Sequence, residues 1–288
     1  MKKEVFTNHA FLLFCLTTLF IFAQTSQADL SGFTNLKLWF DGSDIQGNGS
    51  SVSDGADVNL WADKSGNGIN ATNYGKTGGV YVADVFNGQG GVYFGNSNDN
   101  WLRTEVSSEL DFVESTVFMV ADFMSSPSHF AMSEGSVRDN EYTIWTNTMG
   151  HSFNSAGSAI WPSFTIPDNE LYVQTGVWGQ GFHDMTMSIN GTETYGGEWQ
   201  FGNGEPDFTA VPRAAFLGQR AEYYDEDFDG LIAEVIVFEG KLTTEQQNEV
   251  GWYLTQKYGV ETTYTDPVPE PATLSLLALG GLLIRKRR

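Results

Sequence analysis

Residues 228–238 read Phe228-Asp229-Gly230-Leu231-Ile232-Ala233-Glu234-Val235-Ile236-Val237-Phe238, and this stretch decides the fold class. From Leu231 onward two sets of side chains alternate with a period of two, which is the period of a β-strand. The same alternation recurs over residues 185–189, and residues 116–123 are nearly all apolar, as in a strand covered on both faces. Asn190-Gly191 predicts a tight hairpin turn. Together these patterns predict an all-β fold, a two-sheet antiparallel jelly-roll sandwich.

One short helix is expected after the last strand. The Thr243 hydroxyl can cap the helix start while Gln246 reaches back, which is the capping-box arrangement. Val250 and Leu254 are four residues apart and form a buried stripe. Gly259 supplies a left-handed stop. We expect this helix to pack on the surface of the sandwich.

The N-terminus has the pattern of a secretory signal peptide. Lys2 and Lys3 precede an apolar stretch over residues 10–22, and Ser26-Gln27-Ala28 offers small residues to signal peptidase. We therefore assign residues 1–28 to a signal peptide with Ala28 as its last residue.

The C-terminus carries a second targeting signal. Pro269-Glu270-Pro271 is followed by an apolar run over residues 272–284 and by Arg285-Lys286-Arg287-Arg288, and the whole resembles a PEP-CTERM sorting tail. The apolar run is shorter than the roughly 20 residues that span a bilayer, and the N-terminal run is also too short. The resemblance implies a transient inner-membrane intermediate, with the basic terminus, including Arg285 and Arg287, on the cytoplasmic side. It also implies that an exosortase-type protease cuts near residues 269–271.

These two signals leave residues 29–262 as one all-β domain and residues 263–288 as the tail. The formal net charge is −21, and it becomes −26 once six basic residues at the two ends and Glu4 are removed. Such a charge argues against nucleic acid and anionic lipid as partners of the domain. The single cysteine, Cys15, lies in the signal peptide, so the exported protein has no disulfide.

Several segments resemble the LamG-like, concanavalin A-like jelly rolls of secreted bacterial proteins. The matching segments are residues 36–41, 61–68, 87–94, 216–218 and 228–259. The resemblance implies a concanavalin A-like jelly roll, a fold that hosts lectins, adhesion modules and hydrolases.

Glu109-Leu110-Asp111-Phe112-Val113-Glu114 fits the Glu-x-Asp-x-x-Glu signature of laminarinase-like glycoside hydrolases. In that interpretation Glu109 is the nucleophile, Glu114 the acid and Asp111 tunes the nucleophile, with the two glutamates about 5 Å apart. Strand alternation places Glu109 and Asp111 on one face, and a bulge is needed to return Glu114 to it. The alternative is a polar connection into the strand at 116–123. We favour the connection, because the sugar-contacting tryptophan and glycine expected before the motif are absent.

Residues 225–230 begin like an EF-hand calcium loop, with acids at positions one, three and five and a glycine at six. Position twelve falls on Ile236, so the bidentate glutamate is missing, and the alternative is an acidic, solvated turn. The resemblance nevertheless implies that loop oxygens at the rim hold a calcium ion, and no other cofactor is expected. The candidate ligands are Asp225, Asp227 and Asp229, followed by Asp41 and Asp63.

Aromatic side chains suit a sugar-binding surface, because apolar sugar faces stack on their rings. The candidate binding residues lie in the middle of the chain and are Trp145, Trp161, Trp178 and Trp199. The alternative for each is a place in the core, which is where most tryptophans of a large sandwich lie. Trp61 and Trp101 match family positions and are expected to be structural.

The sequence thus favours a non-catalytic carbohydrate-binding module of the exopolysaccharide or biofilm matrix, secreted to or held at the surface of a Gram-negative-type bacterium. Its expected partners are extracellular polysaccharide and, during export, signal peptidase and an exosortase-type protease. Two alternatives stay open. One is a retaining glycoside hydrolase, and the other is a structural matrix or adhesion protein that binds no particular glycan.

Overall fold

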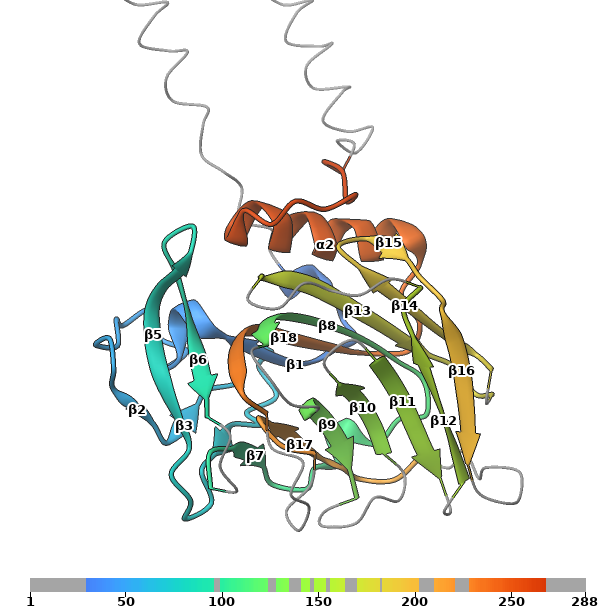
Figure 1. Cartoon of the computed structure of the whole chain (residues 1–288). Helices are drawn as coiled ribbons and strands as arrows, with labels where there is room; N and C mark the ends of the chain where they lie inside the picture. Colours follow the sequence, from blue (N-terminus) through green and yellow to red (C-terminus); the bar gives the residue numbers. More distant parts are fainter. Residues whose placement is uncertain are drawn as a thin grey trace, which may run out of the picture.

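The computed structural model describes residues 30–95, 99–123, 128–134, 141–145, 148–153, 156–163, 170–181, 183–201, 210–220 and 228–267. Two antiparallel sheets stack as a sandwich with a helix on one side (Figure 1), which confirms the predicted fold class. The signal peptide with Ala28 and the tail residues Pro269, Glu270, Pro271, Arg285 and Arg287 lie outside the described residues.

Sheet A joins nine of the described strands. In spatial order they are β15 (Thr192–Glu193), β14 (Met185–Ile189), β13 (Tyr172–Trp178), β8 (Ser115–Phe123), β18 (Gly230–Glu239), β6 (Gln89–Phe94), β5 (Gly79–Phe86) and β2 (Asp57–Val58), with β1 (Leu36–Asp41) beside the second half of β18.

Sheet B also joins nine of the described strands. Their order is β16 (Gly197–Phe201), β12 (Ala156–Trp161), β11 (Thr148–Phe153), β10 (Glu141–Trp145), β9 (Ser128–Ser133), β17 (Ala214–Leu217), β7 (Leu102–Thr104), β4 (Ala71–Thr72) and β3 (Leu60–Trp61). Short 3-10 turns are η1 (Leu30–Gly32), η2 (Gly42–Asp44) and η3 (Ser108–Leu110).

The strand β18 lies at the middle of sheet A and carries a β-bulge. Its pairing with β8 shifts by one residue between Ile232 and Glu234. Ile232 and Val235 therefore both face the core between the sheets, whereas Ala233 and Ile236 face the other side. The predicted strict alternation from Leu231 to Phe238 is wrong at this point, because the extra residue of a bulge reverses the faces that follow it.

The β14–β15 hairpin has the predicted turn. Asn190 and Gly191 both have positive φ, 51° and 76°, as a type I′ turn requires. Met185, Met187 and Ile189 are buried and alternate with more accessible neighbours, as predicted.

The helix is α2 (Thr244–Tyr258), and its predicted ends are confirmed. Thr243 Oγ1 accepts a hydrogen bond from Gln246 N at 3.3 Å, and Gln246 Oε1 accepts one from Thr243 N at 3.0 Å. Gly259 ends the helix in the left-handed conformation with φ 68°.

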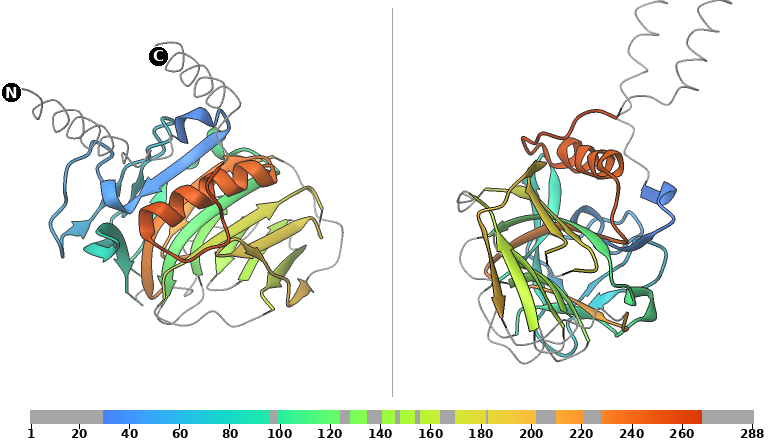
Figure 2. Two further views of the ribbon diagram at one scale, coloured as in Figure 1. Left: turned by 90° about the horizontal axis from the view of Figure 1, so that it is seen from above. Right: turned by 90° about the vertical axis from the view of Figure 1, so that its right-hand side faces the viewer.

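The helix covers the outer face of sheet A (Figure 2). Val250 and Leu254 of α2 belong to a buried cluster with Phe118 of β8 and with Ile236 and Phe238 of β18. The middle of sheet A is thus covered on both faces, by sheet B on one side and by α2 on the other.

The segment after α2 runs back along the helix, and we call residues 260–265 the C-terminal strap. Thr263 N donates to Asn190 O at 2.8 Å. The Asn248 side chain makes two hydrogen bonds with the backbone of Thr265. Its Nδ2 donates to Thr265 O at 2.8 Å, and its Oδ1 accepts from Thr265 N at 2.9 Å. Residues 263–265, which the sequence analysis assigned to the tail, are therefore held on the domain.

Candidate functional site: a cleft at the edge of the sandwich

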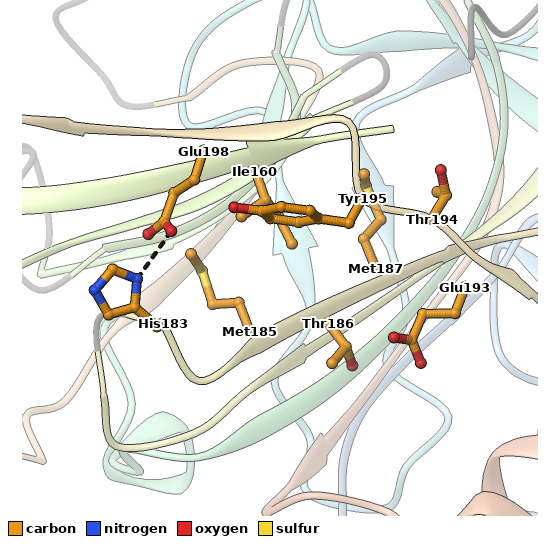
Figure 3. A pocket seen from close by; sticks show the side chains of 9 residues that line it. All are labelled: Ile160, His183, Met185, Thr186, Met187, Glu193, Thr194, Tyr195 and Glu198. Atoms are coloured by element: carbon orange, nitrogen blue, oxygen red, sulfur yellow. Dashed lines mark hydrogen bonds and ion pairs between the residues drawn. The ribbon is translucent and has the colours of Figure 1, made fainter. Parts of the chain in front are cut away.

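A cleft of about 320 Å³ opens where the edges of the two sheets meet. The chain passes there from β15 of sheet A into β16 of sheet B. We call this the edge cleft (Figure 3), and its lining residues are Ile160, His183, Met185, Thr186, Met187, Glu193, Thr194, Tyr195 and Glu198. Its volume is in the usual range for small-ligand sites.

The apolar part of the edge cleft comes from strands of both sheets. Met185 and Met187 on β14 and Ile160 on β12 are buried side chains. β14 of sheet A and β12 of sheet B are in contact, and side chains of both strands line the cleft. The cleft therefore has a hydrophobic base with polar groups above it.

The polar part is organised around Glu198 on β16. Its Oε2 lies 2.8 Å from Nδ1 of the exposed His183, and its Oε1 accepts from Ser158 Oγ and, at 3.4 Å, from Gln200 Nε2. Partial burial opposes ionisation, but the hydrogen bonds from Ser158, His183 and Gln200 outweigh it and hold the pKa of Glu198 below its ordinary value. Glu198 is therefore a fixed carboxylate at neutral pH.

The order of these groups excludes a nucleophilic triad at this position. A Ser-His-acid triad needs the histidine next to the serine, so that the imidazole can take the hydroxyl proton. Here the carboxylate of Glu198 lies between Ser158 and His183. Ser158 therefore has the carboxylate of Glu198 beside it and not the imidazole of His183.

Two exposed aromatic residues lie near this edge of the sandwich: Tyr195 lines the cleft, whereas Trp161, which follows Ile160 on β12, lies on the other face of sheet B. Tyr195 is 60% exposed and Trp161 is 39% exposed. A methyl group added at Gly197 would overlap the Trp161 indole, so the absence of a side chain there lets the ring lie against the backbone of β16. Gly196 N donates to Trp161 O at 2.6 Å, which ties the segment carrying Tyr195 to β12.

Thr194 holds the residue next to Tyr195 in place. It is buried, its backbone N donates to Met187 O at 2.9 Å, and its Oγ1 accepts from Ser163 N at 2.9 Å. Tyr195 thus projects from an anchored backbone, which reduces the entropy lost when a ligand stacks on its ring.

The four predicted tryptophans have different environments. Trp178 is fully buried, donates from Nε1 to Gly150 O at 3.2 Å, and packs edge-on against Tyr142. It connects the two sheets, so its assignment as a binding residue is wrong. Trp161 is exposed on the face of sheet B opposite to the cleft lining, against Gly197. Trp145 and Trp199 lie on β10 and β16, and their side chains are outside the described part of the structure.

The residues of the hydrolase signature do not lie on a strand. Glu109 belongs to the 3-10 turn η3, and Asp111 ends that turn, so the predicted strand alternation of these two residues is wrong. Glu109 pairs with Lys37 at 3.3 Å, and Glu114 precedes β8. None of the three carboxylates lines the edge cleft.

A buried arginine holds this signature segment as a structural connection. Arg213 Nη1 donates to Leu110 O at 3.1 Å and to Phe112 O at 2.7 Å. The backbone around Asp111 is therefore fixed by hydrogen bonds from the neighbouring strand segment.

Of the candidate calcium ligands, Asp225 and Asp227 lie outside the described residues. Asp229 Oδ1 accepts a hydrogen bond from the Tyr93 hydroxyl at 2.8 Å, and this bond, with burial, raises the pKa of Tyr93. Among the residues that the structure does describe, no three His, Cys, Asp or Glu side chains gather as a metal-binding set.

The weaker calcium candidates have protein partners instead. Asp41 is paired with Lys64 at 2.8 Å and with Lys257 at 2.6 Å. Asp63 fixes its own loop by accepting hydrogen bonds from the backbone nitrogens of Trp39, Ser65 and Ile69.

Sequence reasoning missed Tyr195, Glu198 and His183 as members of one site. The available signal was the Asn190-Gly191 turn followed shortly by Tyr195 and two glycines, which indicates an aromatic side chain beside a close backbone approach. The partners of Tyr195 come from other strands and have no sequence signal of their own.

Comparison with known proteins identifies the tail. Residues 267–288 match the PEP-CTERM protein-sorting motif, as predicted. The motif implies export through an exosortase-type system to the surface of a Gram-negative-type bacterium. Within the described part of the chain, no helix has the length and apolar character needed to cross a membrane. No curated protein sequence matches this chain.

Several solved structures are similar at low identity. Domain 4 of AbnA, a GH43 extracellular arabinanase from Geobacillus stearothermophilus in complex with arabinotriose, is 16% identical with a TM-score of 0.46, over 74% of this chain and 96% of that one. The binding domain of Paraclostridial Mosquitocidal Protein 1 is 12% identical with a TM-score of 0.49, over 79% of this chain and 53% of that one. Trypanosoma rangeli sialidase is 9% identical with a TM-score of 0.43, over 80% of this chain and 34% of that one.

Proposed function

We propose that this protein is an exported, non-catalytic, LamG-like carbohydrate-binding protein whose ligand occupies the edge cleft. The observation that carries the proposal is that an exposed aromatic ring and a fixed carboxylate line the same cleft. Tyr195 offers ring surface, and Glu198 with His183 offers hydrogen-bonding groups. Extracellular polysaccharide, as in a biofilm matrix, is the ligand class that an exported protein of this kind meets.

The chemistry of sugars matches both parts of the site. A pyranose ring has an apolar face that stacks on Tyr or Trp, which contributes beyond the area buried. Its hydroxyl groups donate to carboxylates, and hydrogen bonds to a charged acceptor are stronger than neutral ones. Tyr195 supplies the first contact and Glu198 the second, and both line the same cleft.

The ionisation of Glu198 supports binding without hydrolysis. A glycosidase acid must carry a proton near neutral pH, so its pKa has to be raised. The pKa of Glu198 is lowered instead, because its hydrogen bonds outweigh its partial burial. Glu109, the nucleophile of the alternative interpretation, is paired with Lys37 on a 3-10 turn.

The test is glycan-array binding by the processed protein and by a Tyr195→Ala variant. We expect Tyr195→Ala to weaken binding by roughly tenfold or more, because loss of a stacked ring costs about 1–2 kcal/mol. The matched control is Tyr74→Ala, which removes a tyrosine that is 46% exposed just after β4, near the opposite edge of sheet B. Repeating the array with a calcium chelator tests whether glycan binding needs the calcium ion expected from the sequence.

Two results would contradict the proposal. Absence of binding to any polysaccharide would favour the structural matrix protein. Release of reducing ends from mixed-linkage or β-1,3-glucans by the native protein, but not by Glu109→Gln, would establish the hydrolase.

A further inference from the structure

The charged side chains that line the edge cleft are two glutamates and one histidine. Glu193 comes from β15 of sheet A and Glu198 from β16 of sheet B, and His183 is paired with Glu198. In the view of Figure 3, Glu198 and Glu193 lie toward opposite ends of the cleft with Tyr195 between them. The described lining contains no lysine or arginine.

The cleft stays negative whichever form His183 takes. Ser158, His183 and Gln200 hold Glu198 as a carboxylate. Glu193 is an exposed glutamate on β15. A protonated His183 offsets only one of the two negative charges, so the net charge of the lining is negative in both cases.

The net charge of the whole chain is negative, like that of the cleft lining. The formal net charge is −21, and a net field of this size steers charged ligands toward or away from a surface. A polysaccharide of uronic acids is therefore repelled both at long range and inside the cleft. A sugar with a positive charge is attracted at both distances.

The exposed ring of Tyr195 adds a second contact for a cation. An ammonium group over the face of a tyrosine is attracted by the ring quadrupole. Tyr195 is 60% exposed and lines the same cleft as both glutamates. An amine on a sugar stacked at Tyr195 thus meets an aromatic face and a carboxylate together.

Resting on the proposed function, we propose that the edge cleft selects a sugar that carries a free amine, that is, a de-N-acetylated hexosamine unit, over its neutral counterpart and over anionic sugars. Glu193, Glu198 and Tyr195 supply the contacts that recognise the amine. Neutral sugars bind through stacking and hydroxyl hydrogen bonds alone, and uronates bind least.

The test is calorimetric titration of the processed protein, purified from the cell exterior, with three probes. These are a β-1,4-linked glucosamine trisaccharide, the same trisaccharide fully N-acetylated, and a galacturonate trisaccharide. We expect the amine form to bind about tenfold more tightly than the acetylated form at ~0.01 M salt, with a smaller preference at ~1 M, where screening acts over about 3 Å.

Variants that neutralise one carboxylate show whether the preference for the amine form arises in the cleft. Glu193→Gln should reduce the preference for the amine form by several-fold, because it removes one carboxylate and keeps the shape of the side chain. Glu105→Gln is the matched control, since Glu105 is an exposed glutamate just after β7, away from the cleft, and it should keep the full preference.

The outcomes separate this inference from the proposed function. If the acetylated probe or the uronate binds as tightly as the amine, and Tyr195→Ala weakens that binding, amine selection is wrong and carbohydrate binding stands. If Glu105→Gln lowers the preference as much as Glu193→Gln does, the selection arises from overall charge and not from the cleft. If no probe and no arrayed glycan binds, both proposals fail.

Discussion

At the scale of single residues, two buried carboxylates share one ammonium group. Lys257 Nζ lies 2.6 Å from Asp41 Oδ1 and 2.7 Å from Glu234 Oε2, and Lys64 Nζ lies 2.8 Å from Asp41 Oδ2. Burial opposes the charge on Asp41, but Lys257 and Lys64 outweigh it and hold the pKa of Asp41 below its ordinary value. Burial raises the pKa of Glu234, although Lys257 opposes that shift. The two pairs of Lys257 attach α2 to sheet A.

The Asp41 pairs should make part of the stability depend on pH. We expect Asp41→Asn to lower the free energy of unfolding by about 3 kcal/mol at neutral pH, because two buried or half-buried ammonium groups lose a partner. A carboxylate with a depressed pKa stabilises the fold above its unfolded pKa, 3.8 here, and loses that contribution as the pH falls through its folded pKa. Urea unfolding at a series of pH values should show the two proteins converging below pH 3.8.

The control for this measurement is Asp57→Asn, which changes an exposed carboxylate on β2 and should cost little at any pH. A constant difference between wild type and Asp41→Asn from neutral to acid pH would show that Asp41 acts through packing and not through its charge.

At the scale of elements, the C-terminal strap completes the domain. Tyr264 packs over Gly251 of α2 so closely that a methyl group there would overlap its ring, and its hydroxyl lies 2.8 Å from Thr175 Oγ1 on β13. Thr265, which is bonded to Asn248, is two positions before the sorting motif at 267–288. Cleavage within that motif therefore leaves the strap on the folded domain.

Tyr264 should contribute measurably to stability through both packing and its hydroxyl. We expect Tyr264→Phe to cost about 1 kcal/mol, the usual value for one hydrogen bond. Tyr264→Ala should cost about 3 kcal/mol, because the ring contact is lost as well. Chemical denaturation measures both, and Tyr195→Phe, at an exposed tyrosine, serves as the control. Equal stability of wild type and Tyr264→Ala would show that the strap is not a structural part of the domain.

Elements set by neighbouring residues were predictable. The capping box of α2 involves residues three apart, and the Asn190-Gly191 turn involves two adjacent residues, so both were visible in the sequence. The bulge in β18 was not predictable. Glu234 at the bulge accepts hydrogen bonds from Tyr253 and Tyr258 of α2, and only the packing of the helix on the sheet brings these groups together.

At the scale of the whole molecule, acidic residues outnumber basic ones by 36 to 15. Surface carboxylates therefore repel one another across the domain. Raising the NaCl concentration from ~0.01 to ~0.1 M shortens the screening length from about 30 to about 10 Å. We expect the melting temperature to rise by roughly 2–4 °C, which corresponds to about 1 kcal/mol for a domain of this size.

Thermal unfolding followed by circular dichroism checks this expectation, with sucrose at matched osmolality as the uncharged control. A fall in melting temperature with salt would show that attraction within surface ion pairs, such as Lys76 with Asp99, exceeds the net repulsion.

The sequence by itself determined the class of fold, the hairpin turn, the ends of the helix and the sorting tail, because each depends on residues close together in the chain. Only the tertiary structure decided which aromatic residues are accessible. Trp178 connects the two sheets inside the core, whereas Trp161 rests on Gly197 at the surface. The edge cleft was likewise decided by the fold, since Ile160 and Glu198 meet His183 and Met185 only where one sheet ends beside the other. Proximity across two sheets depends on strand register and packing, which no short stretch of sequence encodes.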